Sequence, residues 1–233
     1  MKKILIMLLV AAMAVFMGAC GSSEDEVGEE ELVTGGWTIA DQEEAALPEE
    51  VKGVYETFVN ENGSELVPIA YIAKQVVAGM NYELICKDEE NGTLQSVCLY
   101  QDPQGDLSDT IINEFDVTDY VDSGDTESDE ATAEPVAGGW EVPEDYTVVP
   151  LPKDAQKAFE KAVAEFDGNE LEPMALLATQ LVSGTNYAIL CHSTLVTAEP
   201  VTAVDVVTVY EDLDGNAEIT NICTLDPAEL NEE

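Results

Sequence analysis

Residues 75–82 read QVVAGMNY, and residues 180–187 read QLVSGTNY. The second stretch follows the first by 105 residues and keeps its Gln, its Gly and its Asn-x-Tyr ending. In each copy an apolar pair and a Gly separate two strand-like runs, which is typical of a tight β-hairpin. A hairpin that recurs with its flanking residues indicates a duplicated fold.

Neighbouring blocks repeat at nearly the same distance. GGW at 35–37 recurs at 138–140, and ELVPIA at 65–70 recurs as ELEPMA at 170–175. We therefore divide the chain into repeat one, residues 34–117, and repeat two, residues 138–233. Each repeat is long enough to bury a core of its own, so we expect two domains of one fold.

Each repeat contains one helix signal, which Pro48 and Pro152 open at the position where Pro is favoured. Apolar residues follow at helical spacing. They are Val51, Val54, Tyr55 and Phe58 in repeat one, and Ala155, Ala158, Phe159, Ala162, Val163 and Phe166 in repeat two. Such a helix is amphipathic and needs a sheet to cover its apolar face.

Strand patterns follow each helix, and a short strand precedes it. They cover residues 66–73, 81–86, 97–101 and 110–117 in repeat one, and 175–178, 186–190, 204–210 and 218–225 in repeat two. The turns Asp102–Asp106 and Asp212–Asn216 join the last two strands. The predicted fold class is α+β, with a four- to five-stranded antiparallel sheet wrapped around one helix in each repeat.

Composition excludes several classes of partner. The 233 residues contain 49 Asp and Glu but only 8 Lys and no Arg, for a formal net charge of -41. Nucleic-acid binding and charge-driven docking on anionic lipid need basic residues, so we expect neither. With 45% hydrophobic residues, the chain still has enough apolar side chains for globular cores.

The N-terminus indicates export. Lys2 and Lys3 precede an apolar run of signal-peptide length, and residues 17–20, MGAC, resemble a bacterial lipobox. The resemblance implies removal of residues 1–19, lipidation of Cys20 and an outward-facing anchor on the bacterial cell envelope, with no other membrane contact. The alternative is an ordinary secretory signal near a Cys. Acidic residues crowd 20–33 and 118–137, which we expect to be a tether and a linker.

The Gly-Gly pair, the helix and the hairpin together resemble the cystatins, a family of cysteine protease inhibitors with a Q-x-V-x-G hairpin. Repeat one carries Gly35-Gly36, QVVAG at 75–79 and Asn81-Tyr82. Repeat two carries Gly138-Gly139, QLVSG at 180–184 and Asn186-Tyr187. The resemblance covers both repeats, and it implies two cystatin-like domains, residues 34–117 and 138–233.

The resemblance also implies that each repeat fills the substrate cleft of a papain-like cysteine protease without being cleaved. In the family, the Gly arm, the first hairpin and the second hairpin form a wedge. The implied protease-binding residues are Gly35, Gly36, Gln75, Val76, Val77, Ala78 and Gly79, and Gly138, Gly139, Gln180, Leu181, Val182, Ser183 and Gly184. The predicted function is a surface-anchored, monomeric, double-headed inhibitor.

An alternative is a non-inhibitory binding or scaffold lipoprotein, in which Q-x-V-x-G only maintains the hairpin. The Pro-Trp of secreted cystatins is absent from both second turns, 102–106 and 212–216. Trp37 and Trp140 follow the Gly pairs, where they either anchor the first strand on the helix or contact a partner.

We expect no enzyme, cofactor or metal site. The single histidine, His192, follows Cys191 directly, and neighbours in a strand point to opposite faces. Residues 212–216, DLDGN, depart from the calcium-loop pattern and read as a hairpin turn. Cys86, Cys98, Cys191 and Cys223 read as buried thiols, although Cys86 and Cys98 lie on consecutive strands and could pair if they stand opposite each other.

Overall fold

The computed structural model describes residues 35–121, 138–144, 150–197 and 200–231. Repeat one contains β1 (Trp37–Ile39), α1 (Glu49–Asn62), β2 (Leu66–Val76), β3 (Met80–Asp88), β4 (Leu94–Gln101) and β5 (Leu107–Glu114). Repeat two contains β6 (Trp140–Glu141), α2 (Lys153–Ala164), β7 (Glu170–Val182), β8 (Gly184–Leu195), β9 (Val201–Glu211) and β10 (Ala217–Leu225). Single 3-10 turns, η1 (Glu44–Ala46), η2 (Val117–Asp119) and η3 (Glu229–Asn231), complete the described elements.

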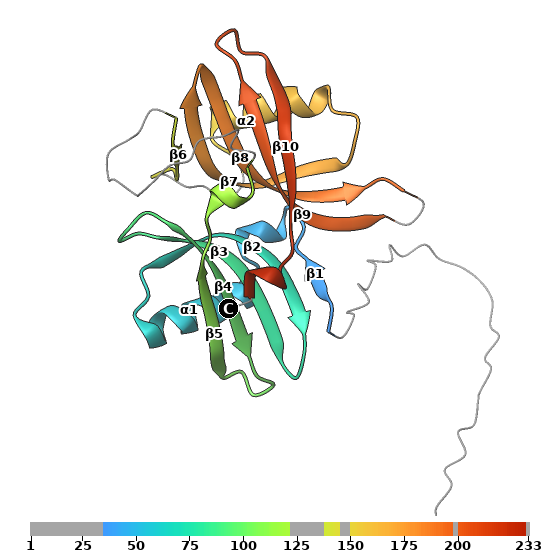
Figure 1. Cartoon of the computed structure of the whole chain (residues 1–233). Coiled ribbons are helices and arrows are strands. Elements are labelled where there is room, and N and C mark those ends of the chain that lie inside the picture. Colours follow the sequence, from blue (N-terminus) through green and yellow to red (C-terminus); the bar gives the residue numbers. More distant parts are fainter. Residues whose placement is uncertain (1–34, 122–137, 145–149, 198–199, 232–233) are drawn as a thin grey trace, which may run out of the picture. The chain divides into compact units, whose positions relative to one another are not determined.

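Each repeat folds into one five-stranded antiparallel sheet, with strand orders β1-β2-β3-β4-β5 and β10-β9-β8-β7-β6 (Figure 1). Within each sheet every strand therefore pairs with its neighbour in sequence; η1 and α1 lie between β1 and β2, and α2 lies between β6 and β7. The expected turns 102–106 and 212–216 join β4 to β5 and β9 to β10. In such a meander alternate connections lie at the same end of the strands.

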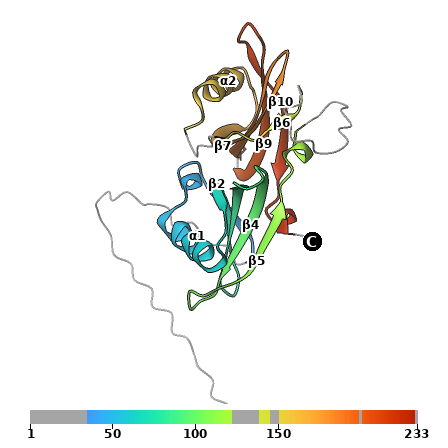
Figure 2. The same ribbon diagram turned by 90° about the vertical axis from the view of Figure 1, so that its left-hand side faces the viewer.

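The helices begin directly after Pro48 and Pro152 and bury most of the predicted apolar positions, but Tyr55 and Val163 are only partly buried and Phe166 lies beyond the end of α2. Buried residues are Val51, Val54 and Phe58 in α1, and Ala155, Ala158, Phe159 and Ala162 in α2. Figure 2 shows both helices from a second side. No helix in the described part of the chain combines the length and apolar character needed to cross a bilayer.

The prediction of two cystatin-like domains, each wrapped around its own helix, is wrong. Strand dominates the described residues, 48% against 20% helix, and the two sheets do not form two such domains. One core cluster joins buried residues of both repeats, including Ile72 and Ile85 of the first sheet and Met174 and Leu190 of the second. A second cluster packs α2 on the other face of the second sheet.

The physical reason is that the central strands are buried on both faces. All five residues from Ile69 to Ala73 are buried, as are Tyr82 to Lys87. A helix can cover only one face of a sheet, so the other face needs a different partner. Here the other repeat supplies it, and the described residues of both repeats belong to one compact unit.

The end of each repeat also binds the sheet of the other. Asn221 on β10 donates to the carbonyl oxygen of Tyr120 at 3.0 Å. Asn113 on β5 donates to the carbonyl oxygen of Leu230 at 2.7 Å. Residues 118–121, at the start of the predicted acidic linker, therefore belong to the structured body, whereas 122–137 lie outside the described residues, as do the predicted signal and tether.

A buried carboxylate lies at this junction. Glu83 on β3 is fully buried, and its Oε2 accepts a hydrogen bond from Asn231 Nδ2 at 2.9 Å. Its Oε1 has no hydrogen-bond partner among the described residues. Burial raises the pKa of Glu83 to about 7, and hydrogen bonds from Asn231 and Cys98 lower that pKa by less.

The raised pKa gives stability a specific pH dependence. The folded chain holds the Glu83 proton more tightly than the unfolded chain, whose reference pKa is 4.5. Stability therefore falls as pH rises from about 4.5 to about 7. The free energy of unfolding of Glu83→Gln minus that of wild type should therefore increase by roughly 2 to 3 kcal/mol when the pH is raised from 5 to 8.

Urea denaturation of both proteins at the two pH values measures this change. Taking the difference between variant and wild type cancels the repulsion that the other carboxylates contribute. A difference that stays constant from pH 5 to pH 8 would contradict the buried, protonated state of Glu83.

Candidate protein-binding edges

Three segments meet at the same end of the strands in each sheet, and we use 'edge' for this border of the sheet. In repeat one, the Gly35 backbone N–H donates to the Val76 carbonyl at 2.9 Å, which places the Gly arm beside the β2–β3 tip. Gln101, the last residue of β4, pairs with Met80 on the other side of that tip. The arm, the tip and the turn 102–106 are therefore neighbours.

Repeat two has the same arrangement. Trp140 of β6 pairs with Gln180 of β7, and Thr185 of β8 pairs with Glu211 at the end of β9. The arm at 138–139, the tip at 182–184 and the turn 212–216 thus share an edge. We call these two surfaces the arm–tip–turn edges.

A chain of side-chain hydrogen bonds ties the arm to the hairpin. Gln75 Nε2 donates to the Gly35 carbonyl at 3.0 Å, and Asn81 Nδ2 donates to Gln75 Oε1 at 2.8 Å. In repeat two, Gln180 donates to the Gly138 carbonyl and accepts from Asn186, both at 2.6 Å. The two Gln residues, which the sequence assigns to protease binding, therefore position the arm.

The glycines that end the two motifs are needed for close packing. A Cβ on Gly79 would lie 2.3 Å from the Gln101 carbonyl oxygen, and a Cβ on Gly184 would lie 2.3 Å from that of Glu211. Gly184 also has φ of +136°. At the arms, Gly35 and Gly138 have φ of +86° and +100°, which favour glycine, whereas Gly36 and Gly139 have no positive φ.

A tyrosine supports each tip from the neighbouring strand. Tyr100 Oη donates to the Ala78 carbonyl at 3.0 Å, and Tyr210 Oη donates to the Ser183 carbonyl at 2.7 Å. Sequence reasoning missed both residues. The sequence does contain a signal for them, because Tyr100 and Tyr210 each lie two residues before the Asp that opens a predicted turn.

The apolar residues of the tips face solvent. Val77 is 39% exposed, Val182 44% and Leu181 72%, whereas Val76 is half-buried. Ala78 and Ser183 are exposed beside them. The Gln and Gly of each motif are engaged in hydrogen bonds and close packing within the chain. The exposed part of each motif therefore consists of Val77 and Ala78 in one repeat, and of Leu181, Val182 and Ser183 in the other.

In each turn an aspartate side chain accepts hydrogen bonds from backbone N–H groups of the same turn. Asp212 Oδ1 accepts from the backbone N–H groups of Asp214 and Asn216, and Asp102 Oδ1 does the same for Gln104 and Asp106. Hydrogen bonds from Asn216 lower the pKa of Asp212. Residues 212–216 are a hairpin turn, as predicted, and no cluster of three metal-binding side chains occurs in the described ranges.

The tryptophans face away from the helices. Trp37 pairs with Gln75, and Trp140 pairs with Gln180, so each tryptophan shares a face with its Gln. Both pack against the core that the repeats share. Anchoring on the helix is therefore not their role.

The cysteines are all free thiols among the described residues. Cys86 stands opposite Gln95, whereas Cys98 stands opposite Glu83, so the register does not allow the conceivable pair of Cys86 and Cys98. Burial raises the pKa of the Cys86, Cys98 and Cys191 thiols. His192 Nδ1 lies 3.3 Å from Glu172 Oε2, while Cys191 packs in the cluster with α2 on the other face.

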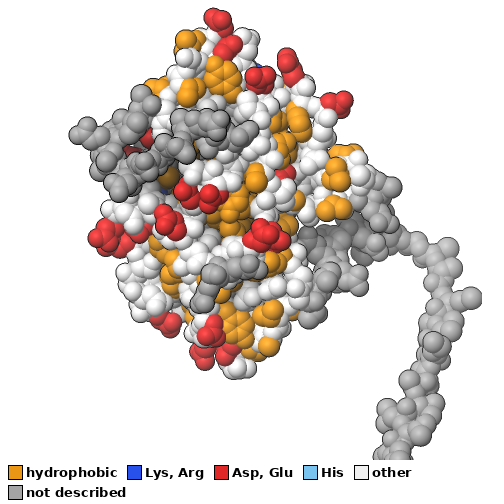
Figure 3. All heavy atoms as spheres, in the orientation of Figure 1, with side chains coloured by type: hydrophobic (Ala, Val, Ile, Leu, Met, Phe, Trp, Pro, Cys, Tyr) orange, Lys and Arg blue, Asp and Glu red, His pale blue; other side chains and the backbone are white. Residues whose placement is uncertain are grey.

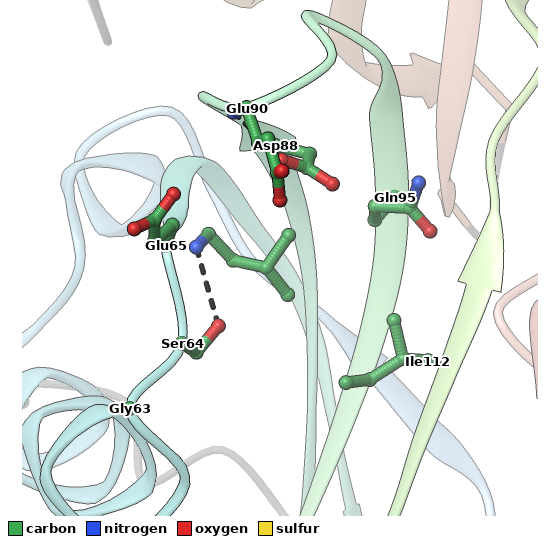
Figure 4. A pocket seen from close by; sticks show the side chains of 8 residues that line it. Gly63, Ser64, Glu65, Asp88, Glu90, Gln95 and Ile112 are labelled. Carbon is green, nitrogen blue, oxygen red and sulfur yellow. Dashed lines mark hydrogen bonds between the residues drawn. The ribbon is translucent and has the colours of Figure 1, made fainter.

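Two hollows border the sheet of repeat one, and the lining of the second also includes residues of repeat two. Figure 4 shows the first, in which Glu65, Asp88 and Glu90 gather at one end, opposite Ile112. The second is a groove of about 550 Å³ beside the arm–tip–turn edge. Its lining includes Trp37, Gln75 and Val77 of that edge.

Comparisons with known proteins give no relative: no family model matches the chain, and no curated protein matches its sequence.

We expect Gly79→Ala to destabilise the chain by roughly 1 to 3 kcal/mol, because the new Cβ meets the Gln101 backbone. Gly53→Ala is the matched control, since a Cβ at this exposed position in α1 meets nothing within 4 Å. The control should be neutral or gain up to roughly 1 kcal/mol from the better helix former. Thermal denaturation measures both, and equal stabilities would show that the tip can open away from β4.

Proposed function

We propose that each arm–tip–turn edge binds protein and occludes the active-site cleft of a papain-like cysteine protease. The observation that carries the proposal is the alignment of arm, tip and turn at one edge, with an uncharged apolar tip in the middle, in both repeats. The proposal depends on this edge and not on the arrangement of the two sheets.

Charge supports the choice of the tips as contact surface. In a chain with a net charge of -41, residues 75–79 and 180–184 contain no charged side chain. In Figure 3 carboxylates are scattered over the visible face among apolar side chains. An uncharged tip can be desolvated without burying an unpaired carboxylate, so it is the favourable place for a dry contact.

Preorganisation supports occlusion. The Gln, Asn and Tyr hydrogen bonds hold each arm and tip in one arrangement before any partner arrives. A segment that is already ordered loses little conformational entropy on binding, so a small apolar area can give useful affinity. A tip that remains a turn also does not present the extended backbone that a protease cleaves.

A non-inhibitory binding protein is the second candidate. It is favoured by the internal roles of Gln75, Gly79, Gln180 and Gly184, which explain their recurrence without any protease. It differs from the first candidate in one measurable respect, which is whether the edges enter a protease cleft.

We further propose that the chain acts as a monomer on the outer face of a bacterial envelope, held by a lipid on Cys20. The lipobox-like residues 17–20 support this location. Residues 20–33 would then hold the arm–tip–turn edges away from the lipid surface through their self-repelling carboxylates.

Titration of papain with residues 21–233 tests the function. We expect inhibition at micromolar protein or below, with two protease molecules bound by one chain. Absence of inhibition at that concentration would contradict the inhibitor and leave the second candidate.

Substitution of the exposed valines locates the contact. Val77→Asp or Val182→Asp alone should reduce the stoichiometry from two proteases to one, and the double variant should inhibit about 100-fold more weakly, since a buried charge without a partner opposes docking. Val201→Asp, at the opposite end of the second sheet and 59% exposed, is the matched control. Full inhibition by the double variant, with an unchanged circular dichroism spectrum, would show that another surface binds.

A further inference from the structure

The groove beside the edge of repeat one is built by both repeats. Its lining consists of Trp37, Gln75, Val77, Asn81, Cys98, Tyr100, Asp109 and Ile111 from repeat one, with Ala228 and Asn231 from the end of repeat two. Asn81, Cys98, Tyr100 and Glu83 lie on one face of the sheet, because Asn81 pairs with Tyr100 and Glu83 with Cys98. This face is the one opposite α1, since Tyr82 on the other side bonds Glu50 of the helix.

The chemistry of the groove is that of a cation site. Its lining contains the carboxylate of Asp109, two aromatic rings and three side-chain amides, but no Lys. Glu83 does not itself line the groove, but it pairs with Cys98 and its Oε2 accepts a hydrogen bond from Asn231, and both of these residues do line it. Its Oε1 has no partner among the described residues. A buried carboxylate next to a groove attracts a cation more strongly than one in water, because the surrounding dielectric is low.

The fold itself does not need this carboxylate. Repeat two has Ala188 at the position 105 residues after Glu83, in the same register between β7 and β9. Ala188 is fully buried there without any polar partner. A buried acid with an unpartnered oxygen reduces stability, so its presence in one repeat alone calls for a ligand or partner.

We infer that this groove binds the guanidinium group of an arginine side chain presented by a protein partner. A guanidinium is planar and weakly hydrated, so it can stack on Trp37 or Tyr100 while it donates to Asp109 and to amide oxygens. The strongly negative chain attracts such a partner from a distance. The inference does not require that the partner be a protease.

The test uses residues 21–233 at pH 8 and two peptides, Ac-Ala-Ala-Arg-Ala-Ala-NH2 and the same peptide with citrulline in place of arginine. Citrulline keeps the shape of arginine but lacks its charge. The NMR signal of the Trp37 indole N–H reports binding in the groove. This signal is identified from the spectrum of Trp140→Phe, in which Trp37 is the one remaining tryptophan. We expect the arginine peptide to bind at least about tenfold more tightly than the citrulline peptide, which corresponds to about 1.4 kcal/mol.

Variants separate the groove from the general charge of the chain. Glu83→Gln and Asp109→Asn should each weaken arginine binding at least threefold, with circular dichroism showing an unchanged fold. Asp106→Asn, an exposed acid in the neighbouring turn that does not line the groove, should leave binding unchanged. Equal binding of the two peptides, no shift of the Trp37 signal, or an equal loss in all three variants would overturn the inference. Since no protease is present, the outcome is separate from that of the inhibition assay.

Discussion

The hydrogen bond from a Gln side chain to a Gly carbonyl holds the candidate site of each repeat together. Gln75 and Gln180 sit near the end of a long strand, where the neighbouring short strand has only two or three residues to hold it. The amide reaches back to the carbonyl of Gly35 or Gly138, and an Asn side chain fixes the amide in turn. In repeat one the link acts together with the backbone hydrogen bond from Gly35 to Val76, which also holds the Gly arm beside the tip.

A second constraint acts on the whole body, because both sheets have two apolar faces. Each helix covers one face, and packing between the repeats covers the other; the buried residues of α1 belong to the same cluster as this packing, whereas α2 has a cluster of its own. The polar contacts of Asn113 and Asn221 with the opposite repeat then fix how the ends of the repeats dock. The arm–tip–turn edges lie at the ends of strands that this core makes rigid, which is a favourable way to present a small binding surface.

The sequence predicts the local structure well, because the signals are local. The duplication, the helices after Pro48 and Pro152, and the two hairpin turns follow from spacing and turn chemistry. The shared core was not predicted, although five consecutive apolar residues at 69–73 are the pattern of a strand with two buried faces. The burial of Glu83 was not predicted either, although Glu83 is the one acid in the predicted strand 81–86 and Ala188 stands at the matching position of repeat two. The internal role of Gln75 depends on a contact 40 residues away.

We propose that arm, tip and turn form one binding surface in each repeat. Amide hydrogen exchange of the chain with and without saturating papain tests it most directly, because it reports all segments at once. We expect slower exchange at 35–36, 76–79 and 102–106, and at 138–139, 181–184 and 212–216, with no change at the opposite hairpin around Leu195 and Val201. Protection confined to other segments, or no protection at the tips, would contradict it.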